Sequence, residues 1–169
     1  MGRIKVRNVL FNILVIITAI AVIFVMFTIV TGTKGYAVTS DSMADRLVRG
    51  DAVFSKAVSF DELREGDIVT VRVGEKGYFT HRIVEIDSEK RTVTTKGDAN
   101  DANDPMETEE KNIAGRMWFS VPYIGYISIL TSGTPSTTVL IILVFTAAAL
   151  IAVNTAISKK RETRGDKNE

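Results

Sequence analysis

The stretch Ile68-Val69-Thr70-Val71-Arg72-Val73 has the alternating pattern of a β-strand and puts its three valines on one face. Residues 74–77 (Gly-Glu-Lys-Gly) have the composition of a turn that ends this strand. Outward from it, short strands are predicted at residues 52–58, 79–86, 91–95 and 117–121, a turn at 87–90 and one helical turn at 60–64. Residues 98–111 read as an acidic loop. The pattern predicts a β-rich domain.

Two apolar stretches flank this domain, at residues 9–30 and 137–157, and neither carries a charge. Each is about as long as the ~20 residues that cross a bilayer as a helix. A cleaved signal peptide is the alternative for the first, but its apolar run exceeds the usual h-region of about 7–15 residues. A buried core helix is the alternative for the second, yet Lys159-Lys160-Arg161 directly after it favours a span. Residues 31–136 are then the only globular domain, between terminal segments 1–8 and 158–169.

The distribution of charge predicts how the chain is oriented. Residues 31–136 hold 13 Lys and Arg against 17 Asp and Glu, whereas the two ends together hold 8 against 3. Because basic residues that flank spans stay in the cytoplasm, both termini are predicted to be cytoplasmic and the domain outside the cell membrane. The acidic balance of the domain argues against nucleic acid as a partner.

The absence of cysteine excludes disulfides, thiolate catalysis and cysteine-ligated zinc, and the single histidine excludes a histidine-rich metal site. The same histidine, His81, is the one side chain whose ordinary pKa, about 6.5, suits a general base near neutral pH. A serine hydroxyl needs such a base before it becomes a good nucleophile. Ser42 lies about a dozen residues after the first span, where a hydrolase acting on a membrane-inserted substrate would need its nucleophile.

Three aspartates follow in an acidic loop, and each has an ordinary structural explanation when taken singly. Asp98 directly follows Gly97 at the end of a predicted strand, which suits a residue that shapes the loop by accepting backbone N–H groups. Asp104 precedes Pro105, whose ring biases it toward an extended conformation that can project the carboxylate toward His81. Asp101 reads as a solvated loop charge, which is also the structural alternative for Asp104.

In order and setting, these residues resemble the type I signal peptidases, in the branch found in archaea, the endoplasmic reticulum and some Gram-positive bacteria. The resemblance covers most of the segment between the two spans. It rests on short motifs: Ser40-Asp41-Ser42-Met43, Arg49-Gly50-Asp51, Gly66-Asp67-Ile68-Val69, Thr80-His81-Arg82-Ile83-Val84, Thr95-Lys96-Gly97-Asp98-Ala99-Asn100, Gly115-Arg116 and Pro122-Tyr123-Ile124-Gly125. One departure is Ala44-Asp45, where the family usually has an acidic residue and a proline.

The resemblance implies a small, mainly β, partly barrel-like catalytic domain between two transmembrane helices. It implies that Ser42 is the nucleophile and His81 the base, and that one of Asp98 and Asp104 orients the histidine. We predict that Asp104 does so and that Asp98 supports the loop. The backbone N–H of Ser42 and the hydroxyl of Ser40 are the implied oxyanion donors. No metal or organic cofactor is implied.

The predicted function is removal of signal peptides with small residues before the cut, at the outer face of the cell membrane. Pairing of that extended segment with a strand edge is the expected mode of recognition. The resemblance allows for accessory membrane subunits. A processing peptidase with few substrates and a non-catalytic membrane-anchored binding module are the alternatives, and the latter predicts that Ser42 can be replaced without consequence.

Overall fold

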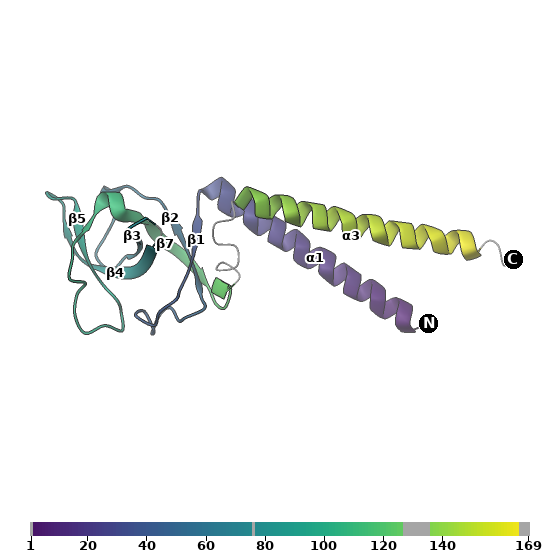
Figure 1. Ribbon diagram of the computed structural model, residues 1–169, viewed down its shortest axis with the longest axis horizontal. Coiled ribbons are helices and arrows are strands. Elements are labelled where there is room, and N and C mark those ends of the chain that lie inside the picture. Colours follow the sequence, from purple (N-terminus) through teal and green to yellow (C-terminus); the bar gives the residue numbers. More distant parts are fainter. Residues whose placement is uncertain (1, 76, 127–135, 166–169) are drawn as a thin grey trace. The chain divides into compact units, whose positions relative to one another are not determined.

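The computed structural model describes residues 2–75, 77–126 and 136–165, and the chain divides into two units. Thr31–Ser132 form one unit, which contains the sheet. Met1–Val30 and Gly133–Glu169 form the other, which contains two helices, α1 (Gly2–Thr31) and α3 (Ser136–Gly165). The elements are labelled in Figure 1.

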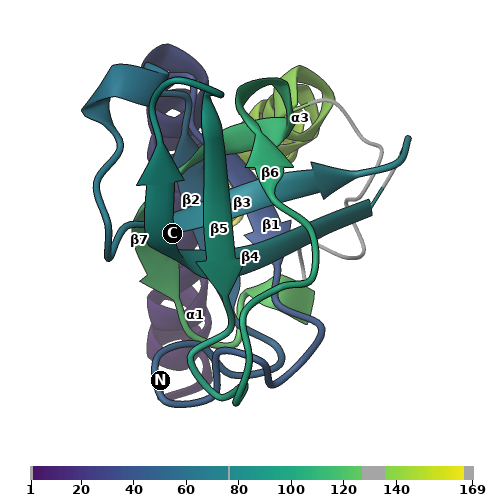
Figure 2. The ribbon, with the colours of Figure 1, turned by 90° about the vertical axis from the view of Figure 1, so that its left-hand side faces the viewer.

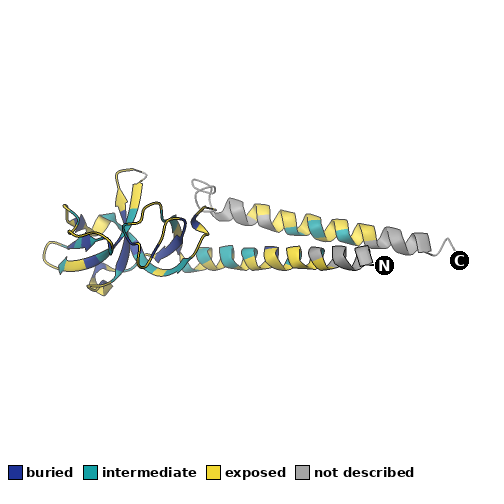
Figure 3. Ribbon diagram, turned by 90° about the horizontal axis from the view of Figure 1, so that it is seen from below, coloured by how far each residue is buried: buried dark blue, intermediate teal, exposed yellow. Residues whose placement is uncertain are grey.

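Helix α1 includes a segment, Phe11–Thr31, of 21 residues with a mean hydropathy of 3.2, long and apolar enough to cross a membrane. Large apolar side chains along it are exposed. Figure 3 colours the exposed residues of the helix yellow. The Thr18 hydroxyl donates to the Leu14 carbonyl and the Thr28 hydroxyl to the Val25 carbonyl, so both find acceptors within the helix. These properties suit a bilayer, in which polar groups need partners inside the segment.

Helix α3 leaves the second predicted span, residues 137–157, unconfirmed. Its apolar part among the described side chains is Val144–Ile157, shorter than the ~20 residues that cross a bilayer. The side chains of residues 137–140 and 143 lie outside the described part of the chain. The second span therefore stays a prediction.

The sheet confirms the mainly β prediction but has seven strands where five were expected. They are β1 (Lys34–Ala37), β2 (Ala52–Lys56), β3 (Ile68–Val73), β4 (Gly77–Asp87), β5 (Thr92–Lys96), β6 (Thr108–Glu109) and β7 (Ile113–Val121). All neighbouring pairs are antiparallel, in the order β1-β2-β7-β3-β4-β5-β6 (Figure 2). The edge strands β1 and β6 each pair with one neighbour, so the sheet is not closed into a barrel.

The two strands that the sequence did not predict are short and weakly patterned. Strand β1 is Lys-Gly-Tyr-Ala, and β6 has only two residues inside the segment expected to be a loop. That segment also contains most of a 3-10 turn, η2 (Glu110–Asn112). The helical turn expected at residues 60–64 is η1 (Phe60–Glu62). Pairing with neighbours, rather than local propensity, makes strands of β1 and β6.

Strand β3 keeps Val69 and Val71 on one face, in the same core cluster, but the third valine of that face lies outside the core. Residues 68–71 are all buried, whereas Val73 is 53% exposed at the end of the strand. The Thr70 hydroxyl is satisfied by Ser55 Oγ at 2.8 Å and Thr80 Oγ1 at 3.2 Å. Both faces of β3 are covered because it separates two core clusters.

Those clusters divide the hydrophobic core of the sheet unit. One consists of Phe60, Leu63, Val69, Val71, Ile83 and Val93. The other consists of Met43, Leu47, Val53 and Ile68. The first cluster therefore anchors β4, and the second anchors the loop between β1 and β2.

Candidate active site

Ser42 lies on the loop between β1 and β2, held by the buried residues that follow it. Met43 and Leu47 are 2% and 0% exposed, and the Leu47 N–H donates to the Met43 carbonyl at 2.7 Å. The Ala44 N–H donates to the Asp41 carbonyl at 3.0 Å and closes a tight turn around Ser42. This turn forms although Ala44-Asp45 replaces the expected acidic residue and proline.

His81 stands on β4, opposite Val69 of β3, and is 9% exposed. Its ring packs against Phe79, with ring centroids 4.8 Å apart. Its Nε2 is 3.1 Å from Ser42 Oγ, a hydrogen-bonding distance across 39 residues of sequence. The structure thus brings the only histidine of the chain to the serine selected from the sequence.

Asp104 completes the line on the other side of the ring. Its Oδ2 is 2.6 Å from His81 Nδ1 and also accepts the Thr95 hydroxyl at 2.6 Å. The Asp104 N–H donates to the Thr95 carbonyl at 2.8 Å, which ties this loop residue to β5. A carboxylate at Nδ1 favours the tautomer with the proton on that nitrogen, which leaves Nε2 free to accept from Ser42.

Among the described residues, no backbone N–H donates to the Asp98 carboxylate, contrary to our expectation. This carboxylate instead forms a bidentate ion pair with Arg82, at 2.8 Å from Nε and 2.6 Å from Nη2. The hydrogen bond to Asp98 raises the pKa of the Arg82 guanidinium. Arg82 Nη1 also donates to the Gly66 carbonyl at 2.7 Å. Sequence reasoning missed Arg82 as a partner, although its position beside His81 was a signal.

The Gly97–Ala99 segment also contacts the backbone of the nucleophile. The Ala99 N–H donates to the Ser42 carbonyl at 2.9 Å, and the Asp98 N–H lies 3.3 Å from Met43 Sδ. A Cβ at Gly97 would lie 2.5 Å from the Ser42 carbonyl oxygen, closer than real Cβ atoms come. Asp98 therefore connects β4 to the serine loop through its neighbours.

Comparison with known protein families shows which family the chain belongs to. Residues 10–113 match the model of the family described as signal peptidase, peptidase S26. The chain belongs to this family. It is accordingly a signal peptidase, a serine peptidase that hydrolyses peptide bonds in signal-peptide processing. The resemblance inferred from the sequence motifs is confirmed.

The relatives of this signal peptidase include catalytic subunits from mammals. The signal peptidase complex catalytic subunit SEC11C of Homo sapiens is 27% identical over 165 residues, which cover 90% of this chain and 82% of the relative. The protein of the same name from Canis lupus familiaris gives the same values. That from Rattus norvegicus is 28% identical over 137 residues, covering 73% of this chain and 71% of the relative.

The remaining predicted residues of the signal peptidase differ in their surroundings. Ser40 Oγ lies 3.2 Å from Ser42 Oγ on the exposed side of the loop. Among the described residues, the Ser42 backbone N–H has no hydrogen-bond acceptor. Asp101 is exposed and, within the described part of the chain, makes no ion pair.

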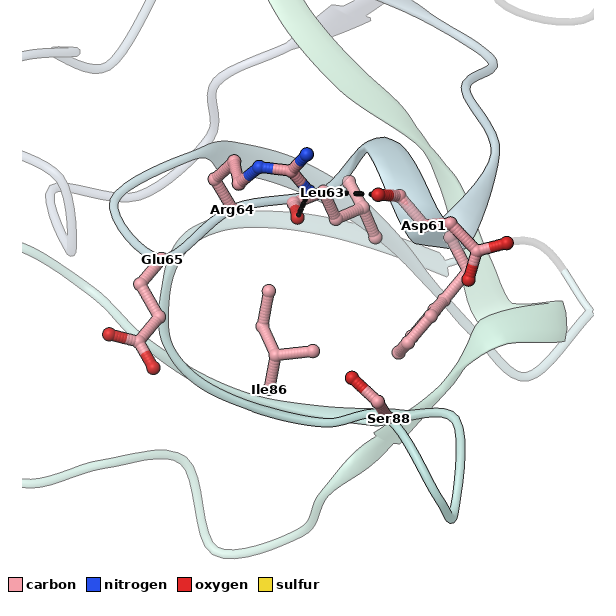
Figure 4. Close-up of a pocket in the computed structure, with 7 residues that line it drawn as sticks. Asp61, Leu63, Arg64, Glu65, Ile86 and Ser88 are labelled. Atoms are coloured by element: carbon pink, nitrogen blue, oxygen red, sulfur yellow. Dashed lines mark hydrogen bonds between the residues drawn. The ribbon is translucent and has the colours of Figure 1, made fainter.

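A cavity beside η1 does not contain these residues. It has a volume of about 460 Å³ and is lined by Phe60, Asp61, Leu63, Arg64, Glu65, Ile86 and Ser88. Figure 4 shows Ile86 and Ser88 on one side of the cavity and Leu63 and Arg64 on the other; the Arg64 guanidinium donates to the Asp61 and Leu63 carbonyls. Because its guanidinium donates to backbone carbonyl oxygens, Arg64 stabilises the chain after η1 and is not assigned a ligand-binding role.

Proposed function

We propose that Ser42 is the nucleophile of signal-peptide cleavage, that His81 is its general base, and that Asp104 orients the histidine. The single observation that carries this proposal is the hydrogen-bonded line from Ser42 Oγ through both ring nitrogens of His81 to Asp104 Oδ2. A positioned nucleophile, a base within reach and a third group that orients the base are the signature of an activated serine.

The reaction follows from these roles. His81 Nε2 takes the proton of Ser42 as Oγ attacks the scissile carbonyl carbon, and Asp104 stabilises the imidazolium that forms. His81 then gives the proton to the nitrogen that leaves with the mature protein, which produces an acyl-enzyme. Water, deprotonated by His81, then attacks the acyl carbon. The bond to Ser42 Oγ breaks, His81 returns the proton to that oxygen, and the signal peptide leaves as a carboxylic acid.

The tetrahedral oxyanion needs donors beside Ser42. The Ser42 backbone N–H supports this role because it has no acceptor among the described residues. The Ser40 hydroxyl is the second candidate, since it lies 3.2 Å from Ser42 Oγ. Losing one such donor typically costs about 10²–10³ in turnover. Ser40→Ala is therefore expected to slow cleavage without abolishing it.

Two free strand edges support recognition of an extended signal peptide with small residues before the cut. In the described chain, β1 pairs only with β2, and residues 77–81 of β4 pair only with β3, because the β4–β5 ladder begins at Arg82. The two edges approach each other where the rings of Tyr36 and Tyr78 lie 4.8 Å apart. Strand β1 precedes the loop that carries Ser42, and β4 carries His81. A peptide could add to either edge as an extra strand.

The membrane setting of the proposal rests on α1 and on charge. Ser42 follows closely after Thr31, the last residue of α1, so the site belongs near one membrane surface. The basic ends favour the outer face, with both termini cytoplasmic. The names of the relatives, catalytic subunits of a complex, support accessory membrane subunits as partners.

The decisive experiment incubates the detergent-solubilised full chain with a preprotein and sequences the new N-terminus. We expect wild type to cut after small residues and Ser42→Ala to produce no new N-terminus while keeping the wild-type melting temperature. Ser136→Ala is the matched control. Cleavage by Ser42→Ala at the wild-type rate, in a preparation free of other peptidases, would remove Ser42 from the mechanism.

A further inference from the structure

Two Gly–Asp turns with the same geometry precede β2 and β3. In the first, the Gly50 N–H donates to the Val38 carbonyl at 2.9 Å, and the Val38 N–H donates to the Asp51 carbonyl at 2.8 Å. In the second, Gly66 and Asp67 make the same two bonds to Ile83, each at 2.8 Å. Gly50 and Gly66 have φ values of +96° and +91°. In each turn, the glycine and the aspartate together oppose a single residue of the partner segment. With the glycine at the first position in the left-handed region of φ, this arrangement is a G1 β-bulge.

The aspartate carboxylates also make the same hydrogen bond in both turns. Asp51 Oδ2 accepts the Val48 N–H at 3.0 Å, and Asp67 Oδ2 accepts the Arg64 N–H at 2.9 Å. In both turns, the residue three positions before the aspartate donates its N–H to the carboxylate. The carbonyl of that same residue accepts the backbone N–H of the aspartate. Each carboxylate therefore closes its own turn from the inside.

The two turns hold the two halves of the catalytic pair. Val38 lies four residues before Ser42, so the first turn closes the base of the loop that carries the nucleophile. Ile83 lies two residues after His81, on the same face of β4, and is 1% exposed in the core. Bulges are over-represented next to active sites, where they aim side chains.

Asp51 is more deeply buried than Asp67, whose Oδ2 also accepts a hydrogen bond from Arg116 Nη1 at 3.2 Å. Asp51 is 6% exposed, and its second oxygen, Oδ1, accepts the Tyr123 N–H at 3.3 Å. Tyr123 has a φ of +63°, which is costly for a bulky residue and persists only where its surroundings fix it. The Gly125 N–H donates to the Gly50 carbonyl at 2.8 Å, so the chain after β7 is bound to the same turn.

We propose that Asp51 and Asp67 are positioning residues for this peptidase, Asp51 for the Ser42 loop and Asp67 for the His81 strand. The inference rests on the proposed roles of Ser42 and His81. Neither carboxylate touches the reacting atoms. Each fixes the backbone from which one member of the pair reaches the 3.1 Å separation of Ser42 Oγ and His81 Nε2.

The test compares kcat and KM of the full chain in detergent for Asp51→Asn, Asp67→Asn and Asp87→Asn, with a preprotein as substrate. Asp87 is the matched control because its Oδ1 also accepts a backbone N–H, from Lys90 at 2.9 Å. It lies six residues beyond His81 on β4, about 20 Å away at the usual rise of a strand. Each variant is assayed well below its own melting temperature.

An Asn at position 51 can satisfy only one of the two N–H groups that Asp51 binds. Since a misplacement of about 1 Å can cost about 10²-fold in rate, we expect kcat to fall about 10- to 100-fold in Asp51→Asn with KM within about twofold. Asp67→Asn should lose about tenfold in kcat, and Asp87→Asn at most twofold. Asp51→Ser, whose hydroxyl can still accept the Val48 N–H, replaces Asp51→Asn if the latter does not fold.

Two results would overturn the proposal. One is a kcat in Asp51→Asn and Asp67→Asn equal to that of the Asp87→Asn control. The other is a rise in KM with kcat retained, which would make these residues substrate-binding. Ser42→Ala, run in parallel, separates this failure from failure of the proposed function, because cleavage by that variant would refute the nucleophile whatever the aspartates do.

Discussion

At the scale of single residues, the two aspartates after β5 have separate environments that predict separate phenotypes. Asp104 meets His81 and Thr95, whereas Asp98 meets Arg82. An Asn at position 104 keeps the shape of the side chain but disturbs the tautomer of the histidine. Losing the orienting Asp of a triad can cost about 10⁴ in turnover while geometry persists.

We therefore expect Asp104→Asn to lose turnover by about that factor with little change in melting temperature. Asp98→Asn breaks a bidentate ion pair that is only partly exposed, so its melting temperature should fall at least as clearly as its turnover. Asp101→Asn is the control and should resemble wild type in both. Turnover and thermal unfolding of the three variants check this assignment. Inactive but stable Asp98→Asn, beside an active Asp104→Asn, would reverse it.

A second prediction at this scale concerns Gly97, which lies against the nucleophile. Gly97→Ala would place Cβ 2.5 Å from the Ser42 carbonyl oxygen and 2.7 Å from Asn100 Nδ2, so the serine loop must shift. We expect kcat to fall by about 10²-fold, as for other misplacements near 1 Å. Gly74→Ala is the control, because Gly74 has a φ of +59° but open space around it. It should lower the melting temperature and leave kcat unchanged, and equal kcat in both variants would contradict the steric argument.

At the scale of elements, Arg91 fastens η2 and η1 to the sheet. Its guanidinium pairs with both Glu110 oxygens and with Asp61, and it lies over the Phe60 ring at 4.8 Å. The Arg91 side chain lowers the pKa of Glu110 below its ordinary value of 4.5. A carboxylate whose pKa is lower in the folded state stabilises the fold above its unfolded pKa, and that contribution is lost as pH falls through the folded pKa.

The melting temperature of wild type should therefore fall more steeply below about pH 4.5 than that of Glu110→Gln. The difference should be small, because the pair is exposed and screened by salt. Thermal unfolding of both proteins between pH 3 and pH 7 measures it. Parallel curves for the two proteins would show that the pair does not contribute.

At the scale of the whole molecule, the line from Ser42 to Asp104 spans both core clusters. Met43 anchors the serine loop in one cluster, to which β3 contributes Ile68. Ile83 anchors the histidine strand in the other cluster, to which β3 contributes Val69. The distance between nucleophile and base therefore depends on the packing of β3. Mutations in β3 far from Ser42 can change activity through this strand.

The membrane topology is the prediction that belongs to the whole chain. A reporter that is active only outside the membrane should work when inserted at Gly74, in the turn between β3 and β4, and should fail after Glu169. The physical reason is the basic excess at the two ends. Activity of the reporter after Glu169 would remove the second span. Activity there and none at Gly74 would reverse the orientation.

Features that depend on local pattern were predictable from the amino-acid sequence. The alternation in residues 68–73 predicted β3 with its observed ends, and the uncharged run near the N-terminus predicted a helix long enough to cross a membrane. Ser42, His81 and Asp104 were selected from residue chemistry, order and resemblance. These signals are readable because hydrophobic period and side-chain chemistry belong to the chain itself.

Tertiary structure decided what depends on residues distant in sequence. The strands β1 and β6 exist through pairing, and Thr70 is buried because β3 has a core cluster on each face. Asp98 forms an ion pair with Arg82, which is distant in sequence. The two Gly–Asp turns have the same geometry because each exchanges two backbone hydrogen bonds with a distant residue, Val38 or Ile83. Contacts between residues a dozen or more positions apart leave no local pattern, because the free energy that selects them comes from packing and hydrogen bonding in the assembled sheet.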